Sequence, residues 1–274
     1  MSPLDGYDLS VLVATWQGRD ALEGCLAALP AACAPRSFEV VVVVNGSTDG
    51  TAEMLGERFP DARIIANRRN LGVARARNQA LAAARGRTLV LLDDDTQPRP
   101  GSLAALADAL EERPDVAIVG PRLESPEGAL SLSCRRFHNG LTPVLRRLAF
   151  IGFVGRSKHL RDFELADWDH ASRREVDQVI GACQALRRDA WERLGPLDGR
   201  MFYGWEDTDY CVRAHRAGMK TLYAPEALVA HRERRLTRAR PFGRLAFEFV
   251  KSMLVFFAKH PAGLLGRYPL DQSH

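Results

Sequence analysis

The stretch TLVLLDDDT (88–96) decides the fold, because a short apolar run passes directly into three consecutive aspartates. An apolar run of this length is typical of a strand buried on both faces. In open α/β sheets, ligands bind beyond the carboxyl ends of the strands. The three aspartates are therefore expected to face a ligand.

Outward from this stretch, strand-like apolar runs alternate with helix-like segments over the first 120 residues. The expected strands cover 10–15, 39–44, 62–66, 88–92 and 116–120, and the expected helices cover 19–31, 72–86, 102–113 and a segment ending at Phe59. This alternation predicts an α/β fold with a Rossmann-like, mostly parallel central sheet flanked by helices.

The rest of the chain is less regular. Periodicity weakens between 123 and 178, where no element can be placed, and order returns at 179–188. The later pattern predicts helices near 189–194 and 205–217, one or two short strands within 221–231 and an amphipathic helix within 242–260. We expect a main domain over 1–240 and a C-terminal helical extension over 241–274.

The composition is that of an ordinary globular protein. Of 274 residues, 46% are hydrophobic and 26% are charged, which excludes disordered, collagen-like and disulfide-stapled classes. The five cysteines contain no Cys-x-x-Cys pair, so the sequence predicts a reducing cytoplasm and no structural zinc site. No leader pattern opens the chain. The apolar run 245–258 is interrupted by Glu248 and Lys251 and is too short to span a membrane.

The net charge of +4 is unevenly distributed. The stretch 231–244 contains six arginines and one acid, and the stretch 135–161 contains six arginines, one lysine and no acid. Such stretches are often solvated surfaces, but they also suit a substrate phosphate or an anionic membrane face. We therefore expect a cytoplasmic protein, with peripheral contact through 231–260 at the inner face of the membrane as one option. A core or dimer helix is the other reading of the tail.

The aspartate triplet has the composition of a metal site. Side chains alternate along an extended chain, so Asp93 and Asp95 are expected on one side and Asp94 on the other. Two carboxylates held together repel each other unless a cation lies between them, and oxygen ligands suit Mg²⁺ or Mn²⁺. The other reading of the triplet is an acidic turn that caps a helix or faces solvent.

Two further clusters could belong to the same site. GWEDTDYCVR (204–213) places three acids in the first turn of an expected helix, where one carboxylate facing a cleft could act as a general base. Asp209 and Arg213 form an ordinary i,i+4 pair that needs no function. His231 ends an apolar segment; if it meets Asp93 and Asp95, its imidazole would favour Mn²⁺ over Mg²⁺.

These segments occur together in an order that resembles a known family. VVNGSTDGT (43–51), NLGVARARN (70–78), LLDDDT (91–96), GACQALRR (181–188), GWEDTDYCVR (204–213) and VAH (229–231) are similar to the family 2 inverting glycosyltransferases with the GT-A fold. The likeness is closest to the rhamnosyltransferase-like branch and covers about residues 8–260.

The resemblance implies a role for each matching residue. Asp95, His231 and Asp93 would hold a divalent metal, Mn²⁺ or Mg²⁺, and Asp207 would be the catalytic base with Glu206 beside it. Trp205 would shape the acceptor side. The donor would lie against Thr15, Asn45, Ser47, Asp49, Arg77, Asp93, Asp94, Gly181 and Ala182. Family members commonly have an aspartate directly before the Asn-Gly turn, and this chain has Val44 there, so a carboxylate contact to the nucleotide base does not carry over.

The implied function is the metal-dependent transfer of a sugar, with inversion, from a nucleotide diphosphate sugar to a hydroxyl group. The donor would be of the dTDP-rhamnose or UDP-sugar type, and the acceptor a glycan or a lipid-linked glycan of polysaccharide or cell-wall biosynthesis. The alternative is a nonenzymatic, degenerate member that binds a nucleotide sugar or a glycan. Nucleic-acid binding has only charge in its favour, with no recognised motif.

Overall fold

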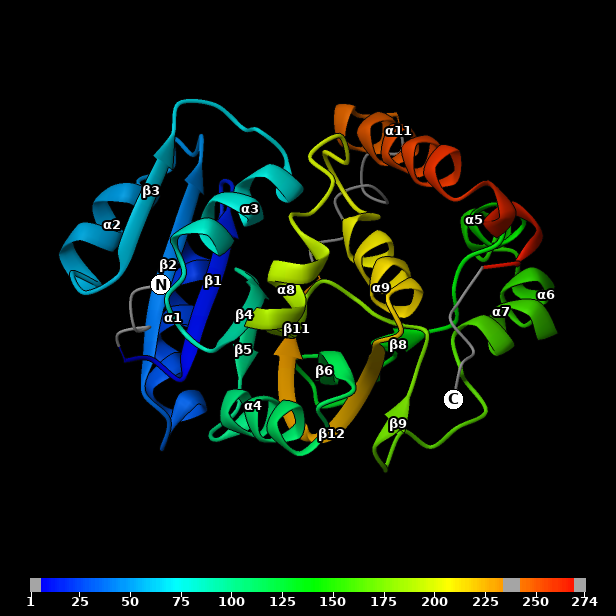
Figure 1. The fold of residues 1–274 in the computed structure, drawn as a ribbon. Helices are drawn as coiled ribbons and strands as arrows, with labels where there is room; N and C mark the ends of the chain where they lie inside the picture. The colour runs from blue at the N-terminus through cyan, green and yellow to red at the C-terminus, as the bar shows by residue number, and fades with distance from the viewer. Residues whose placement is uncertain (1–5, 234–241, 269–274) are drawn as a thin grey trace.

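The computed structural model describes residues 6–233 and 242–268 and contains a single large mixed sheet (Figure 1). Its strand order is β3-β2-β1-β4-β11-β6-β12-β5, with β7 paired to β6 and β9 paired to β12. The strands are β1 Leu9–Thr15, β2 Phe38–Asn45, β3 Arg63–Asn67, β4 Thr88–Asp93, β5 Thr96–Pro98, β6 Val116–Glu124, β7 Leu130–Ser131, β9 Arg174–Glu175, β11 Cys183–Arg187 and β12 Lys220–His231. The α/β fold with a mostly parallel central sheet is confirmed.

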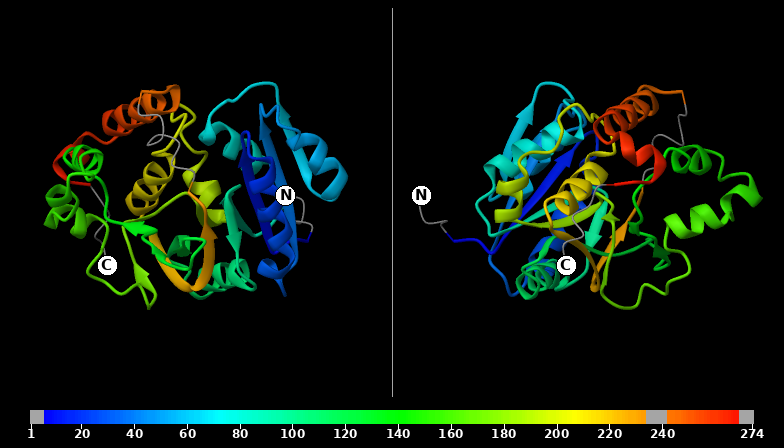
Figure 2. Two further views of the ribbon diagram at one scale, coloured as in Figure 1. Left: turned by 180° about the vertical axis from the view of Figure 1, so that it is seen from behind. Right: turned by 45° about the vertical axis from the view of Figure 1, so that its right-hand side comes forward.

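Helices cover both faces of this sheet. They are α1 Arg19–Cys33, α2 Thr51–Arg58, α3 Val73–Ala83, α4 Ser102–Glu112, α8 Arg188–Leu194, α9 Glu206–Arg216 and α11 Arg244–Lys259, which is followed by the 3₁₀ helix η1 Pro261–Leu265. One buried apolar cluster joins the sheet to α1, α2 and α4, and a second joins the other face to α3, α8, α9 and α11. From behind, α1 lies in front of the parallel strands (Figure 2).

The parallel half of the sheet follows from the sequence pattern. Strands β3, β2, β1 and β4 are all parallel, and β1 pairs residue by residue with β2 and β4. Val41, Val42 and Val43 are fully buried because helices cover both faces of β2. The carboxyl ends of these strands therefore meet at one edge, where Asp93 ends β4.

The other half of the sheet contains β12, the strand that brings His231 to the edge where Asp93 lies. Strand β11 is antiparallel to both β4 and β6, whereas β12 is parallel to β6. Where one or two short strands were expected within 221–231, the structure has one strand of 12 residues, with register shifts at Lys220/Thr221 and Ala224/Leu228. Its last residue, His231, pairs with Thr96 of β5, directly after the aspartate triplet.

The region without sequence periodicity, 123–178, contains mostly short elements. It holds β8 Cys134–Arg135, which pairs with β10 Gln178–Val179, and the helices α5 Thr142–Arg147, α6 Gly152–Gly155 and α7 Lys158–Phe163. Figure 1 shows these helices at the end of the molecule opposite β3. Elements of four to six residues are too short to produce a hydrophobic period in the sequence.

The C-terminal helix α11 is amphipathic, as expected, and its inner face belongs to the core. Phe256 is fully buried, and its ring centroid lies 5.1 Å from that of Trp205. Asp209 of α9 lies 2.9 Å from Nζ of Lys259 and 2.8 Å from Nε2 of His260. On the outer face, Phe247 is 69% exposed. The basic stretch 231–244 falls largely in 234–241, outside the described residues.

None of the helices in the described ranges combines the length and the apolar composition that crossing a bilayer requires.

The two faces of α11 predict different responses to truncation. Phe256→Ala removes a fully buried aromatic ring and should lower the free energy of unfolding by about 3–5 kcal/mol. The matched change on the exposed face, Phe247→Ala, should alter it by less than about 0.5 kcal/mol. Urea unfolding followed by circular dichroism measures both values. Equal values for the two variants would contradict the packing of α11 in the core.

Candidate active site

Asp93 and Asp95 of the aspartate triplet form a cluster with His231 that has the donor set of a metal site. One ligand atom from each of Asp93, Asp95 and His231 lies within 4.8 Å of the others, and His231 Nε2 is 3.3 Å from Asp95 Oδ1. Burial alone would lower the pKa of His231, but the hydrogen bond to Asp95 and the charge of Asp93 raise it. Two carboxylates and an imidazole that share one small space are suited to a divalent cation.

Asp93 and Asp95 lie close together because of a turn, and not because side chains alternate along an extended strand as expected. Strand β4 ends at Asp93, and Asp94 and Asp95 lie in a turn before β5. The separation of Asp94 from the other two is nevertheless as expected: it is buried, and its Oδ2 accepts a hydrogen bond of 2.6 Å from Thr15 Oγ1. Asp94 thus fastens the turn to the end of β1.

Arg77 connects the metal-type cluster to the acids of α9. It is 3% exposed, and its guanidinium donates to Asp93 Oδ1 at 2.6 Å, to Glu206 Oε1 at 3.0 Å and to the carbonyl of Gly181 at 2.6 Å. The carboxylates of Asp93, Glu206 and Asp207 raise the pKa of Arg77 against the opposing effect of burial. The arginine therefore remains charged and holds two carboxylates of different elements together.

The three acids at the start of α9 have three different surroundings. Glu206 and Asp209 are buried, whereas Asp207 is partly exposed. Asp209 is engaged by Arg213 at 3.1 Å and by the end of α11, so the expected structural pair is present. Asp207 accepts hydrogen bonds of 2.8 Å from the backbone amides of Gly181 and Thr208. These amides orient a carboxylate that still reaches solvent.

Glu206 has the most perturbed environment of the three acids. Its Oε2 is buried and has no hydrogen-bond partner within the described part of the chain. Burial and the neighbouring charge of Asp207 raise the pKa of Glu206 to about 8, although Arg77 acts in the opposite direction. A carboxyl group in this state is partly protonated at neutral pH.

Backbone geometry at two positions places these acids. Trp205 precedes α9 with φ +74°, a left-handed conformation that is rare for a residue with a side chain. Its ring is held by those of His138 at 4.5 Å and Phe256 at 5.1 Å. A Cβ atom on Gly181 would lie 2.7 Å from Nη1 of Arg77. The absent side chain at 181 therefore makes room for this arginine.

The other predicted donor residues border the same sheet edge but are mostly engaged in holding loops. Asn45 Oδ1 accepts from the amide of Leu71 at 3.0 Å, and Asp49 Oδ2 accepts from the amide of Arg19 at 3.0 Å. Ser47 Oγ accepts from the amide of Gln17 at 3.1 Å. The carbonyl of Ala182 accepts from the amide of Asp93 at 2.9 Å.

Two residues that the sequence interpretation did not select lie beside the acids. His138 packs on Trp205, and Arg135 lies on β8, close enough to Asp207 for the two charges to interact. Both belong to SLSCRRFHNG (131–140), where the only sequence signal was the basic character of 135–161.

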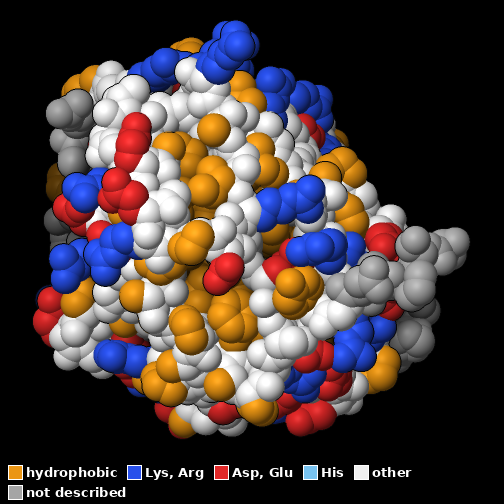
Figure 3. All heavy atoms as spheres, turned by 90° about the vertical axis from the view of Figure 1, so that its left-hand side faces the viewer, with side chains coloured by type: hydrophobic (Ala, Val, Ile, Leu, Met, Phe, Trp, Pro, Cys, Tyr) orange, Lys and Arg blue, Asp and Glu red, His pale blue; other side chains and the backbone are white. Residues whose placement is uncertain are grey.

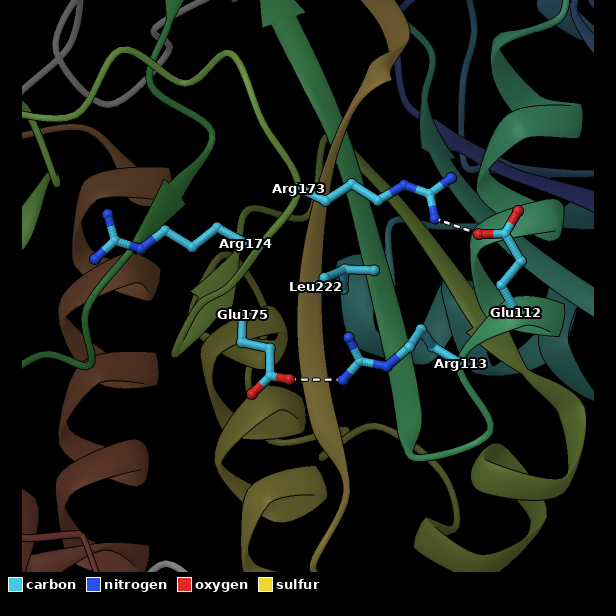
Figure 4. A pocket seen from close by; sticks show the side chains of 6 residues that line it. All are labelled: Glu112, Arg113, Arg173, Arg174, Glu175 and Leu222. Carbon is cyan, nitrogen blue, oxygen red and sulfur yellow. Dashed lines mark hydrogen bonds and ion pairs between the residues drawn. The ribbon is translucent and has the colours of Figure 1, made fainter.

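A cavity of about 540 Å³ lies elsewhere, around the beginning of β12 (Figure 4). Arg173 is paired there with Glu112 at 2.5 Å, and Arg113 with Glu175 at 2.6 Å. Its wall includes Leu222, which at about 3.3 Å per residue is roughly 30 Å along β12 from His231. This cavity is separate from the acidic site, and these arginines already have carboxylate partners.

Comparison with known proteins agrees with this geometry. The family model described as "Glycosyltransferase like family 2" matches residues 7–244. An N-acetylglucosaminyl-diphospho-decaprenol L-rhamnosyltransferase of Mycobacterium tuberculosis is 30% identical over 269 residues, which cover 93% of this chain and 85% of the relative.

Solved structures share the fold at low sequence identity. A mannosyltransferase of Pyrobaculum calidifontis in complex with GDP-Man and Mn²⁺ has a TM-score of 0.61 and 22% identity, covering 96% of this chain and 66% of that chain. GalNAc-T7 with UDP, GalNAc and Mn²⁺ also has a TM-score of 0.61, with 16% identity, covering 97% of this chain and 59% of that one. Both of these chains are thus longer than the present protein. The structural likeness shows that the protein has the GT-A fold.

The environment of Glu206 predicts a pH-dependent difference between the wild type and Glu206→Gln. The folded protein holds this proton up to about pH 8, whereas an ordinary glutamate loses it near 4.5, so the folded state binds more protons between these values. Wild-type stability relative to the variant should therefore fall as the pH rises from about 4.5 to about 8, by at least about 1 kcal/mol. Urea unfolding in EDTA at several pH values measures the difference. A difference that does not change with pH would contradict the burial of an ionisable Glu206.

Proposed function

This chain belongs to glycosyltransferase family 2, and we propose that it is a metal-dependent, inverting enzyme that transfers a sugar from a nucleotide diphosphate sugar to an acceptor hydroxyl. One observation carries the proposal: Arg77 joins Asp93 of the metal-type cluster to Glu206, next to Asp207. A donor-binding cluster and a partly exposed carboxylate thus share one edge of the sheet.

The residues present fit a divalent metal. Asp93, Asp95 and His231 supply two carboxylates and an imidazole from β4, the following turn and β12, and these are ligands suited to Mn²⁺ and Mg²⁺. Two structural neighbours were solved in complexes with Mn²⁺, which supports this assignment. A divalent metal bound there would neutralise the charge that develops on the leaving diphosphate.

Asp207 is the proposed general base. The two backbone amides that bind it fix its orientation, and its partial exposure leaves it accessible to an acceptor. Asp207 takes the proton of the acceptor hydroxyl as the hydroxyl oxygen forms a bond to the anomeric carbon of the donor. The bond from that carbon to the diphosphate breaks on the opposite face, so a single displacement inverts the configuration.

Glu206 and Trp205 position this base. Glu206 accepts a hydrogen bond from Arg77 on one oxygen. In its protonated form, Glu206 adds no second negative charge beside Asp207. Trp205 is fixed between His138 and α11, which places its ring at the start of α9 on the acceptor side. Both residues therefore act by holding the first turn of α9 in place.

The proposed donor is of the dTDP-rhamnose or UDP-sugar type, and the proposed acceptor is a lipid-linked glycan. The mycobacterial relative is an N-acetylglucosaminyl-diphospho-decaprenol L-rhamnosyltransferase, which supports a rhamnosyl donor and a lipid-linked acceptor. Peripheral membrane contact is part of this proposal. It is supported by the exposed outer face of α11, where Phe247 is 69% and Leu254 is 61% exposed. We place the catalytic unit within 1–240, with 241–274 as a helical extension that packs onto it through Phe256.

Removal of the base predicts a loss of turnover without a loss of donor binding. Asp207→Asn keeps the size of the side chain but cannot accept the hydroxyl proton, so kcat should fall by about 10²- to 10⁴-fold. Calorimetry with the nucleoside diphosphate should give an affinity close to that of the wild type. The matched control is Asp189→Asn on α8, whose side chain is 66% exposed and which should leave kcat unchanged. A variant Asp207→Asn with near wild-type kcat would exclude Asp207 as the base.

Metal dependence predicts the result of a donor panel. The purified protein is incubated with UDP-, dTDP- and GDP-sugars and Mn²⁺ or Mg²⁺, and release of nucleoside diphosphate is measured. Slow release from one donor class should occur, stop in EDTA and be lost in Asp95→Ala, because Asp95 is a proposed ligand. Release that persists in EDTA would contradict the metal assignment, and the absence of both release and donor binding would contradict the enzymatic proposal.

A further inference from the structure

Arg135 lies beside the first turn of α9, close to the proposed base. It ends the short strand β8 and pairs with Gln178, whose Oε1 accepts a hydrogen bond of 2.6 Å from Thr208 Oγ1. Thr208 directly follows Asp207, so β8 and the base are connected through the side chains of Gln178 and Thr208. The charge of Asp207 acts on the Arg135 guanidinium.

The Arg135 side chain is partly exposed and has no hydrogen-bonded counter-ion within the described residues. Its Nε is shielded from solvent and has no hydrogen-bond partner among the described residues. Burial lowers the pKa of Arg135, and the negative charges of Glu164, Asp207 and Glu233 act in the opposite direction. A desolvated charge is costly unless it is paired and hydrogen-bonded. An anionic ligand would satisfy it.

A second guanidinium, that of Arg146, packs on the same aromatic ring as Arg135. The guanidinium carbons of Arg135 and Arg146 lie 5.9 and 5.7 Å from the ring centroid of Phe163. Phe163 packs at 4.5 Å on His138, which in turn packs at 4.5 Å on Trp205. Burial, together with the charges of Arg146 and Arg135, holds the pKa of His138 well below its usual value. Arg135 of β8 and Arg146 of α5 therefore bring two positive charges to the Phe163 ring, next to His138.

Unpaired polar atoms are concentrated around these arginines. His138 Nδ1 and Trp205 Nε1 are both buried and lack a hydrogen-bond partner within the residues that the structure describes. Buried polar atoms without partners are uncommon in folded proteins. Their concentration beside Arg135 indicates a place where a ligand supplies the missing partners.

We propose that Arg135 and Arg146 form a subsite for the diphosphate of a lipid-linked acceptor, beside Asp207, so that the sugar attached to this diphosphate presents its hydroxyl to the base. Guanidinium groups suit phosphate oxygens because they combine charge with several donors in a fixed geometry. The inference rests on the proposed function and adds to it the residues that recognise the anionic part of the acceptor.

The surface next to Arg146 suits the apolar chain that such a diphosphate carries. The exposed apolar residues there form the α5–α6 patch, which consists of Leu141 (53% exposed), Val144 (53%), Leu148 (38%), Phe150 (83%) and Phe153 (80%). The 3₁₀ helix η1 extends it with Leu265, which is 74% exposed, because the amide of Gly140 donates to the carbonyl of Leu264 at 3.0 Å. Exposed apolar residues gathered in this way are characteristic of an interaction surface.

The charge around this patch identifies the occupant as a prenyl diphosphate. The segment 135–161 contains seven basic residues and no acid, so an anion joined to an apolar chain matches both of its properties. The face of the molecule beyond α2 and β3 differs, since basic and acidic side chains are interspersed there with apolar ones (Figure 3). The two guanidinium groups lie between the α5–α6 patch and Trp205, in the order in which a lipid, a diphosphate and a sugar are joined.

The test compares two neighbouring arginines on a charged and an uncharged acceptor. Farnesyl-diphospho-N-acetylglucosamine carries the diphosphate, and octyl N-acetylglucosaminide lacks it. Arg135→Gln should raise KM for the first acceptor about tenfold or more and KM for the second less than about twofold. Arg136→Gln, a change at the adjacent exposed residue, should alter both values less than about twofold. Arg135→Lys should retain part of the preference because it keeps the charge.

The outcomes separate this inference from the proposed function. If Arg135→Gln raises KM equally for both acceptors, or if Arg136→Gln reproduces its effect, the subsite is overturned. Calorimetric binding of the donor nucleotide shows that each variant is folded. A wild type that transfers sugar to neither acceptor sinks the proposed function itself, whereas a wild type that uses both equally well sinks only the subsite.

A second part of the same experiment tests whether the prenyl chain of the acceptor binds to the α5–α6 patch. Lengthening the acceptor from a dimethylallyl to a farnesyl diphosphate should lower KM for the wild type. The double variant Val144→Ser, Leu148→Ser should lose most of this gain while keeping the preference for the charged acceptor. Ile64→Ser, at a partly exposed position on β3, is the matched control. A full gain in the double variant would exclude the α5–α6 patch as the binding surface of the chain.

Discussion

The Arg77 guanidinium is the interaction on which the site depends. Asp93 comes from a strand end, and Glu206 and Asp207 come from a helix start far away in the sequence. The negative charges of Asp93 and Asp207 would drive these two elements apart. A single buried cation that bonds Asp93, Glu206 and the Gly181 carbonyl turns this repulsion into a fixed arrangement. The glycine at 181 belongs to the same constraint, since a Cβ atom there would occupy the space of the guanidinium. Removal of Arg77 would leave the buried Glu206 and the partly exposed Asp93 without this partner, which is costlier than the absence of the whole network.

A second constraint is the length of β12. A parallel strand of 12 residues that starts beside Val116 reaches β5, which follows the aspartate turn, and sets His231 against Asp95. The register shift at Ala224/Leu228 lets β12 change its alignment with β6 before it reaches this edge. The metal-type cluster is therefore assembled by pairing between strands, and its geometry has the rigidity of the sheet.

The sequence predicts the parts of this protein that local pattern controls. The apolar run before Asp93 marks a strand, and GWEDTDYCVR marks a helix start, so the fold and the two acidic clusters follow from periods of two and 3.6 residues. The separation of Asp94 from Asp93 and Asp95 was also predictable, although the cause is a turn and not an extended strand. The burial of Arg77, by contrast, depends on contacts across more than 100 residues. Arg135 and His138 belong to a segment whose conformation is set by α7, α9 and β10, and no local pattern indicates such contacts.

The three acids that begin α9 show how one helix start carries several functions at once. The positive end of the helix favours all three charges equally, so their different states arise from their partners. Asp209 contacts Lys259 and His260 and fastens α11, and Glu206 contacts Arg77 in a buried setting. Asp207 is held by two backbone amides and remains partly exposed. Because Trp205 is packed against Phe256 of that same helix, α11 determines where the first turn of α9 lies. The C-terminal helix is thus coupled to the proposed base through both an ion-pair cluster and an aromatic contact, and a change in its packing would move Asp207.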